Sequence, residues 1–167
     1  DFNSKWRNRL SFHQKDDIEI YNIWNDKKLY TKLIEDFLSI IPEEGYDLIA
    51  TVESGGFIFA SPIAYRLEKG LLTIRKIHEK NISADPICTN TFMNCKNEQE
   101  VLCIDSDMIN IKNNYLIIDD LCKSLETLKC VLDMVEVNGN KVSYIAVIAN
   151  LSGADNLKGI PIYSIIN

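Results

Sequence analysis

The chain has 167 residues, of which 46% are hydrophobic and 25% are charged, a balance typical of a globular protein with one core. Its formal net charge of −6 argues against binding to the phosphate backbone of nucleic acids, because proteins that do so carry a clustered basic face. No apolar run approaches the roughly 18 residues that span a bilayer, so we expect no membrane partner either.

Cysteine usage bears on the redox state of the chain. The five cysteines are Cys88, Cys95, Cys103, Cys122 and Cys130. Their odd number and the absence of a C-x-x-C pair predict reduced thiols in a cytoplasmic protein. A zinc site on Cys88, Cys95 and Cys103 is the alternative, but its spacing is irregular and the only nearby histidine is His78.

The first 25 residues are polar and mixed, with scattered aromatic residues, and predict an N-terminal arm or hood with little regular structure. A helix is expected from Asp26, because apolar residues then follow at helical spacing along one stripe. The stripe consists of Leu29, Leu33, Ile34, Phe37, Leu38 and Ile41. Pro42 and Gly45 are expected to end this helix.

Residues 47–52 are predicted to form a buried strand that ends in the turn Glu53-Ser54-Gly55-Gly56-Phe57. A helix through residues 62–67 is expected to begin at this turn. Paired glycines at such a junction let backbone N–H groups approach a ligand closely. The alternative is that the two glycines only make a tight turn.

A second strand is expected at residues 71–74, with Arg75 and Lys76 at its carboxyl end. Two cations at this point suit an anion, and a solvated basic pair is the alternative. Residues 77–113 then form a polar, Asn-rich segment in which a strand is predicted at residues 101–104. We expect the rest of this long segment to be a flexible flap over a site.

The most informative stretch is a buried strand at residues 115–118 that runs into Asp119 and Asp120. A helix with one apolar face follows over residues 125–135 and closes at Asn138-Gly139. In open α/β sheets, ligands lie beyond the carboxyl ends of strands, where helix N-termini point outward. Two acids followed by a phosphate-sized loop therefore indicate a sugar-phosphate site.

Further strands are expected at residues 142–149 and 162–166, so strands and helices alternate from residue 26 to about residue 150. This alternation predicts an α/β fold with a mainly parallel twisted sheet flanked by helices. The sequence contains no repeat, low-complexity tract or linker. We therefore expect one domain over residues 1–167, with a small hood at 1–25 and a flexible flap at 77–113.

Three stretches together resemble the type I phosphoribosyltransferase family, most closely its adenine type. They are residues 52–64, which keep the family's Glu, Gly, Phe, Pro and Ala, residues 73–76 with the Arg-Lys pair, and residues 118–121. The last of these starts the family motif for phosphoribosyl pyrophosphate (PRPP). Residues 157–164 also fit the adenine type, and the spacing matches from about residue 46 to the end.

The resemblance implies the fold of that family and a role for each matched residue. Asp119 and Asp120 would bind the ribose hydroxyls of PRPP or a nucleotide, directly or through Mg²⁺, and Lys76 would approach the pyrophosphate. The loop at 122–127 would hold the 5′-phosphate on backbone N–H groups. The phosphate-binding candidates are Lys123, Ser124, Thr127, Arg75, Glu53, Ser54 and Gly55. The reaction would displace pyrophosphate with a purine nitrogen, in a cytoplasmic homodimer.

The loop after the two acids departs from the family pattern. Leu125 and Glu126 stand where the family commonly has two glycines. One interpretation is that Ser124 caps the following helix and Glu126 serves as its own anion, so that no phosphate is needed. The other is that Lys123, Ser124 and Thr127 keep one cation and two hydroxyls that still hold a phosphate.

Two further departures fall on positions expected to do chemistry. Gly55 stands where the adenine type commonly has a phosphate-binding Arg, and Lys96 stands where the flap has a carboxylate. Glu98 or Glu100 could replace that carboxylate only after a shift in register. Two functions follow as alternatives: a Mg²⁺-dependent purine phosphoribosyltransferase, or a non-catalytic relative that binds a nucleotide, a base or a protein partner.

Overall fold

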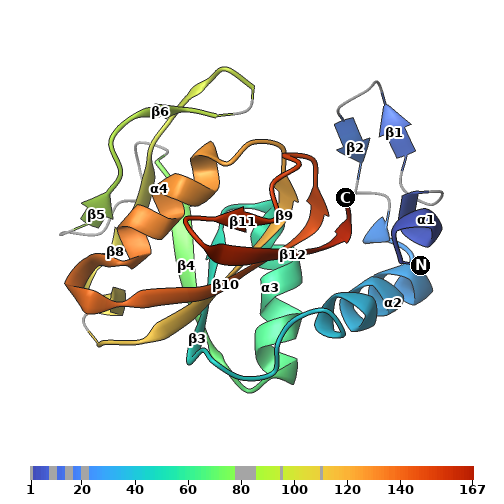
Figure 1. Cartoon of the computed structure of the whole chain (residues 1–167), viewed down its shortest axis with the longest axis horizontal. Helices are drawn as coiled ribbons and strands as arrows, with labels where there is room; N and C mark the ends of the chain where they lie inside the picture. The colour runs from blue at the N-terminus through green and yellow to red at the C-terminus, as the bar shows by residue number, and fades with distance from the viewer. Residues whose placement is uncertain are drawn as a thin grey trace.

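The computed structural model describes residues 2–7, 11–13, 17–19, 23–77, 86–94, 96–109 and 111–167. At its centre is an eight-stranded sheet with the strand order β11-β12-β10-β9-β3-β4-β8-β5 (Figure 1). In chain order these strands are β3 (Leu48–Val52), β4 (Gly70–Lys76), β5 (Pro86–Cys88), β8 (Leu102–Asp105), β9 (Asn114–Cys122), β10 (Lys141–Asn150), β11 (Asn156–Leu157) and β12 (Ile160–Ile166).

The middle of this sheet is parallel. Strands β12, β10, β9, β3 and β4 pair in parallel register, while β8 and β5 extend one edge and β11 the other in antiparallel pairing. Helix α3 (Gly55–Arg66) connects β3 to β4, and α4 (Glu126–Val135) connects β9 to β10. The predicted α/β fold with a mainly parallel sheet flanked by helices is therefore confirmed.

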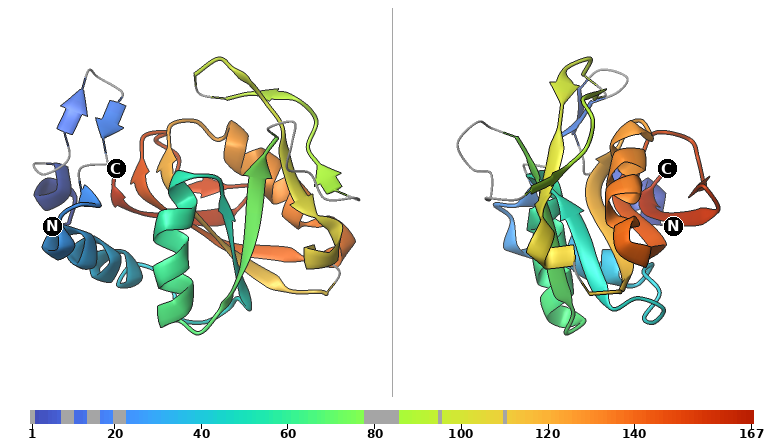
Figure 2. Two further views of the ribbon diagram at one scale, coloured as in Figure 1. Left: turned by 180° about the vertical axis from the view of Figure 1, so that it is seen from behind. Right: turned by 90° about the vertical axis from the view of Figure 1, so that its left-hand side faces the viewer.

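Helices cover both faces of the sheet (Figure 2). Side chains of β9 show how the two cores arise, because successive residues of a strand point to opposite faces. Leu116 and Ile118 pack in the core with α2 (Lys27–Leu38) and α3. Tyr115 and Ile117 pack in the core beneath α4, and all four residues are fully buried. The near-continuous apolar run before Asp119 is thus the signature of a strand buried on both sides.

The predicted helices and strands are found close to their expected positions. Asp26 caps α2, since its Oδ1 accepts hydrogen bonds from the N–H groups of Lys28 (2.9 Å) and Leu29 (3.0 Å). The strands expected at 47–52, 71–74, 101–104, 142–149 and 162–166 correspond to β3, β4, β8, β10 and β12. No helix in the described ranges has the length and apolarity to cross a bilayer.

The N-terminal segment is more regular than expected. It contains α1 (Phe2–Arg7) and a hairpin of β1 (Ser11–His13) and β2 (Asp17–Glu19), so the prediction of little regular structure was wrong there. Trp6 is fully buried, and its Nε1 donates to Asp36 Oδ2 of α2 at 3.0 Å. Burial opposes ionisation of Asp36, but hydrogen bonds from Lys32, Lys5 and Trp6 outweigh it and lower the pKa of that carboxyl.

The segment predicted as a flap contains short antiparallel elements. A hairpin of β6 (Phe92–Met93) and β7 (Gln99–Glu100) precedes β8, and 3₁₀ turns follow at η2 (Ser106–Ile109) and, after α4, at η3 (Val137–Gly139). Residues 78–85, 95 and 110 of the predicted flap lie outside the described residues. Closure of this segment over a site stays a prediction.

Two of the cysteines form a disulfide, which corrects the prediction of reduced thiols for this pair. Cys88 and Cys103 are register partners in the antiparallel β5–β8 ladder, and their Cα atoms are 4.2 Å apart. The same bond rules out a zinc site that uses both sulfurs. Among the residues that the structure describes, Cys122 and Cys130 take part in no disulfide, and Cys95 lies outside those residues.

Candidate active site

The candidate site lies at the carboxyl edge of β3, β4 and β9, where parallel strands end together. Three segments with sequence-predicted residues reach this edge: the turn from β3 into α3, the end of β4 and the end of β9. The adjacency of β9, β3 and β4 in the sheet brings them together. Their contacts decide which predicted residues act as a group.

The turn from β3 into α3 contains Glu53, Ser54 and two glycines that are closely packed. A Cβ atom on Gly55 would lie 2.0 Å from Asp120 Oδ2. A Cβ on Gly56 would lie 2.5 Å from Thr51 Oγ1 and 3.0 Å from Asp119 Oδ1. Real Cβ atoms do not approach other atoms this closely, so these positions have no room for a side chain. Gly55 stands at the position of the phosphate-binding arginine that the resemblance implied. An arginine would not fit there, because Asp120 fills the space next to it.

Asp119 and Asp120 both bring carboxylate oxygens to the start of α3. Asp119 Oδ1 accepts from the N–H of Asp120 at 2.9 Å, and Asp120 Oδ1 accepts from the N–H of Leu121 at 2.8 Å. Burial, and then the charge of Asp120, raise the pKa of Asp119 well above its ordinary value, while Lys76 acts in the opposite direction. Asp119 and Asp120 are thus two adjacent acids at the end of β9, and the positive charge of Lys76 favours the ionised form of Asp119.

The end of β4 supplies Lys76 but separates it from Arg75. The backbone N–H of Lys76 donates to Glu53 Oε2 at 3.1 Å, which ties the ends of β3 and β4 together. Lys76 Nζ lies 2.8 Å from Glu100 Oε1 in β7. Arg75 is exposed, and because it precedes Lys76 on a strand its side chain leaves the opposite face. Lys76, Glu53 and the two acids therefore form one group, with Arg75 outside it.

The loop after β9 does not form the predicted serine cap. Leu125 occupies the N-cap position of α4, and its apolar side chain makes no capping bond. Ser124 lies one residue before the N-cap position. Glu126 forms an ion pair with Lys129 at 2.7 Å, on the exposed side of the first turn. The interpretation in which Ser124 caps the helix is therefore wrong, and Glu126 is engaged with a cation of its own helix. Lys123, Ser124 and Thr127 are half-buried around this helix start.

Sequence reasoning gave Glu100 a role only after a shift in register. In the structure it is buried beside Lys76, and through this ion pair the predicted flap adds a further residue to the group of Lys76, Glu53 and the two acids. A carboxylate two residues before the apolar stretch at 102–104 was visible in the sequence. What the sequence did not supply was the antiparallel pairing of β8 with β4, which sets Lys76 opposite Leu102.

The acids at this edge fit a weakly held Mg²⁺ ion. No cluster of three or more metal-binding side chains occurs among the residues that the structure describes. Mg²⁺ keeps several waters and is often held by only one or two carboxylates together with substrate phosphates. Asp119 and Asp120 offer that kind of donor set, as two adjacent carboxylates at the end of β9.

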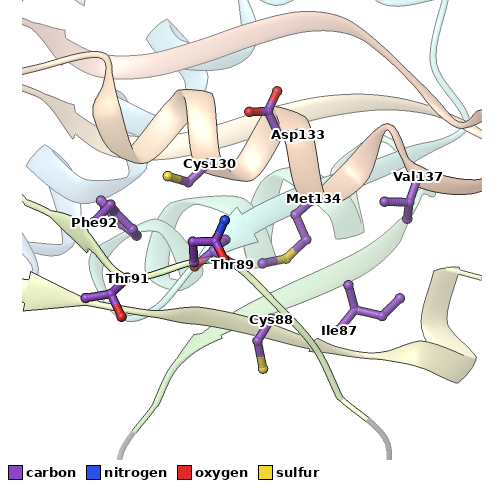
Figure 3. Close-up of a pocket in the computed structure, with 10 residues that line it drawn as sticks. Ile87, Cys88, Thr89, Thr91, Phe92, Cys130, Asp133, Met134 and Val137 are labelled. Carbon is purple, nitrogen blue, oxygen red and sulfur yellow. The ribbon is translucent and has the colours of Figure 1, made fainter.

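A separate cavity of about 320 Å³ lies between α4 and the 87–92 segment (Figure 3). Its walls include Phe92, Met134 and Cys130, and Met134 points from α4 toward the strand segment in Figure 3. Burial, followed by the charges of nearby acids, raises the pKa of the Cys130 thiol. None of the predicted catalytic or phosphate-binding residues lines this cavity, although Cys88 of the excluded zinc site does.

Comparison with known proteins places this geometry in a family, although no family model matches the chain. The adenine phosphoribosyltransferase of Caldicellulosiruptor saccharolyticus is 31% identical over 97% of this chain and 93% of its own length. That of Ruminiclostridium cellulolyticum is 31% identical over 99% of this chain and 98% of its own.

Solved structures agree with the sequence relatives. The enzyme of Thermoanaerobacter pseudethanolicus superposes with a TM-score of 0.78 at 27% identity, over 90% of this chain and 87% of its own. That of Saccharomyces cerevisiae, complexed with an imino-altritol bisphosphate and adenine, has the same fold, with a TM-score of 0.81 at 19% identity over 99% and 98% of the two chains. The chain belongs to the adenine phosphoribosyltransferase family.

Proposed function

We propose that the chain transfers the 5-phosphoribosyl group from PRPP to a purine base, with adenine as the first candidate and purine salvage as its role. The bond between ribose C1 and the pyrophosphate oxygen breaks, and pyrophosphate leaves with the electron pair. A ring nitrogen of the base forms the new bond to C1 and releases its proton to solvent. The products are a purine nucleotide and pyrophosphate.

The observation that carries this proposal is the meeting of the two β9 acids with Lys76 at the carboxyl edge, in a chain so similar to adenine phosphoribosyltransferases. Asp119 and Asp120 are proposed to hold the ribose hydroxyls. Lys76 is proposed to bind the pyrophosphate, which carries negative charge as it leaves. Mg²⁺, when bound, would neutralise charge on the ribose and pyrophosphate oxygens.

The phosphate contacts are proposed to come from two helix starts. The N-terminus of α4 suits the 5′-phosphate, because its first N–H groups carry no side-chain cap. Lys123, Ser124 and Thr127 would add one cation and two hydroxyls there. In the turn before α3, Ser54 and Gly55 would contribute backbone N–H groups toward the pyrophosphate. Glu53, whose own N–H donates to the Ile74 carbonyl at 2.9 Å, would shape the turn, and Arg75 would lie at its outer rim.

The test is an assay with PRPP, Mg²⁺ and adenine that follows both AMP formation and pyrophosphate release. Asp120→Asn should lower turnover by roughly 10- to 100-fold, the scale of one lost charge-assisted hydrogen bond. Asp155→Asn, an exposed acid in a loop, is the matched control and should leave turnover unchanged. AMP binding without turnover for any purine would replace the proposal with the non-catalytic alternative.

We also propose that residues 1–167 act as one domain, that two copies form a homodimer, and that the protein works in the cytoplasm. Light scattering on the purified chain tests the dimer. The disulfide Cys88–Cys103 bears on the location, since the cytoplasm keeps most thiols reduced. Mass spectrometry of the alkylated protein from cells would report whether that bond persists there.

A further inference from the structure

The side chain of Lys76 is held by a buried carboxylate. Its Nζ lies 2.8 Å from Glu100 Oε1, and the side chain of Glu100 is only 8% exposed while that of Lys76 is 37% exposed. Removal of a carboxylate from water is unfavourable unless its oxygens gain donors. The lysine at the site therefore has a fixed partner within the protein before any ligand arrives.

The second oxygen of Glu100 is also occupied. Asn94 Nδ2 donates to Glu100 Oε2 at 3.0 Å. Asn94 in turn closes the β6–β7 hairpin, because its Oδ1 accepts from the N–H groups of Lys96 (2.9 Å) and Glu98 (3.0 Å). The carboxylate thus links the lysine of the site on one side to the turn of the hairpin on the other.

We propose that Glu100 is an internal anion that competes with the diphosphate group of the ligand for Lys76. This inference rests on the proposed function, because it takes Lys76 as the residue that binds pyrophosphate. A diphosphate carries more charge than a carboxylate, so the ammonium group exchanges Glu100 for the ligand when PRPP or pyrophosphate enters. Glu100 is in this sense a positioning residue, which sets how strongly the site takes diphosphates relative to a nucleotide monophosphate.

The exchange also reaches the hairpin. When Lys76 leaves, Glu100 keeps only its bond to Asn94 in a buried position, which favours movement of β7 toward solvent. Phe92 is the register partner of Glu100 and lines the cavity next to α4 (Figure 3). Diphosphate binding should therefore loosen the hairpin, while AMP, which has no diphosphate, should not.

The test compares pyrophosphate and AMP binding to the wild-type chain and to Glu100→Gln by calorimetry. The variant has one acceptor oxygen for two donors, so Lys76 loses its charged partner. Pyrophosphate affinity should rise by roughly tenfold, the scale of one close and partly buried ion pair. AMP affinity should change by less than about twofold, because the exchange involves only the diphosphate.

Glu98→Gln is the matched control. Glu98 lies in the same hairpin and accepts from Asn94 Nδ2 at 3.2 Å, but it is exposed, and Lys76 is paired with Glu100. This variant removes the same charge and should leave the affinity for pyrophosphate unchanged. Glu100→Asp keeps the charge on a shorter side chain that cannot reach both donors, and it should give an intermediate affinity.

A readout without ligand checks the pair itself. Reductive methylation followed by mass spectrometry measures how readily the Lys76 amine reacts. Its rate should increase in Glu100→Gln and stay at the wild-type value in Glu98→Gln. Hydrogen exchange should also become faster at the hairpin amides of Asn94 and Asn97 when the wild-type chain binds pyrophosphate, but not when it binds AMP.

The outcomes separate this inference from the proposed function. If AMP binds and Glu100→Gln binds pyrophosphate no more tightly than wild type does, Glu100 does not compete with pyrophosphate for Lys76. Only the inference about Glu100 is then wrong. Weaker pyrophosphate binding by the folded variant would likewise overturn it, since Glu100 would then assist the ligand. If neither AMP nor pyrophosphate binds the wild-type chain, the proposed function falls and the inference with it.

Discussion

Strands β3 and β9 are neighbours in the sheet, and each is followed by a helix that begins at the same edge. At the start of α3, the protein's own carboxylates fill the space, with Asp120 Oδ2 only 2.0 Å from where a Cβ of Gly55 would lie. At the start of α4, the N-cap residue Leu125 makes no side-chain capping bond, and Glu126 turns to Lys129.

The difference teaches how one edge can hold two kinds of anion. A helix N-terminus favours negative charge, whether the charge belongs to the protein or to a ligand. At α3 the protein's own carboxylates, together with the hydroxyl of Thr51, leave no room for a side chain at Gly55 and Gly56, so only backbone groups can face a ligand there. At α4 the internal acid has its own cation partner, which supports an external phosphate at this helix start. Four predictions would break or sharpen this contrast.

The largest effect on stability is expected at the turn from β3 into α3, where carboxylates and Thr51 fill the space around the two glycines. Gly56→Ala would place a Cβ 2.5 Å from Thr51 Oγ1 and 3.3 Å from the backbone oxygen of Ile118. Overpacking of this kind should lower the free energy of unfolding by about 1–3 kcal/mol. Urea unfolding measures it, with Ser61→Ala on the exposed side of α3 as the control. An unchanged urea midpoint for Gly56→Ala would show that this turn has room for a Cβ atom.

A pH effect is expected from the same turn. The pKa of Asp119 is raised in the folded chain, so folding favours its protonated form. Its contribution to stability is complete below the ordinary pKa of 3.8 and is lost as pH rises through the higher native value. Asp119→Asn lacks this loss, so the stability of the variant relative to wild type should increase with pH.

Urea midpoints across a pH series measure this difference. Asp120→Asn is the informative companion, because it removes the second cause of the raised pKa and leaves burial, the first cause, in place. Its own pH dependence should be weaker than that of wild type. Parallel curves for wild type and Asp119→Asn would mean that Asp119 ionises as freely in the folded chain as in the unfolded one.

A smaller effect is expected at the start of α4, where no side chain caps the helix. Glu126→Gln removes a negative charge from the helix start where the 5′-phosphate is proposed to bind, worth about 0.3–1 kcal/mol. AMP affinity, measured by calorimetry, should rise by about twofold to fivefold. Asp133→Asn, an exposed acid later in α4, is the control. A fall in AMP affinity would indicate that Glu126 itself contacts the ligand.

The smallest effect is expected at Ser124. A capping serine contributes about 1 kcal/mol, but Ser124 does not cap α4, so Ser124→Ala should change the unfolding free energy by less than about 0.5 kcal/mol. Asp26→Ala removes a true cap and should lower it by about 0.5–2 kcal/mol. Thermal unfolding of both variants measures the two changes. An equal loss of unfolding free energy in Ser124→Ala and Asp26→Ala would mean that Ser124 does cap α4.

Local patterns in the sequence were sufficient for the parallel sheet and for the acids at its edge. The apolar run before Asp119 reports burial on both faces, and Asp26 is a cap because its own neighbours supply the N–H groups. Each of these features depends on residues close in sequence. That is why they could be predicted without knowledge of the fold.

The features that could not be predicted depend on long-range contacts. Trp6 orders the N-terminal segment through Asp36, which lies 30 residues away. The disulfide of Cys88 and Cys103, and the pairing of Lys76 with Glu100, follow from antiparallel strand registers that no local pattern encodes. The glycine pair was visible, but the reason for Gly55 is the carboxylate of Asp120, from a strand far along the chain.

The two edges of the sheet limit how this protein can associate. The outermost described strands are β5, with three residues beginning at Pro86, and β11, with two residues. Strands this short, one of them starting with a residue that lacks an N–H donor, offer little ladder for another chain to extend. Strand β11 pairs only with Ile160 and Pro161 of β12, and helix α1 packs against β12 as well. We therefore expect β5 and β11 not to template pairing with another sheet, and a dimer of this protein to join through side-chain surfaces.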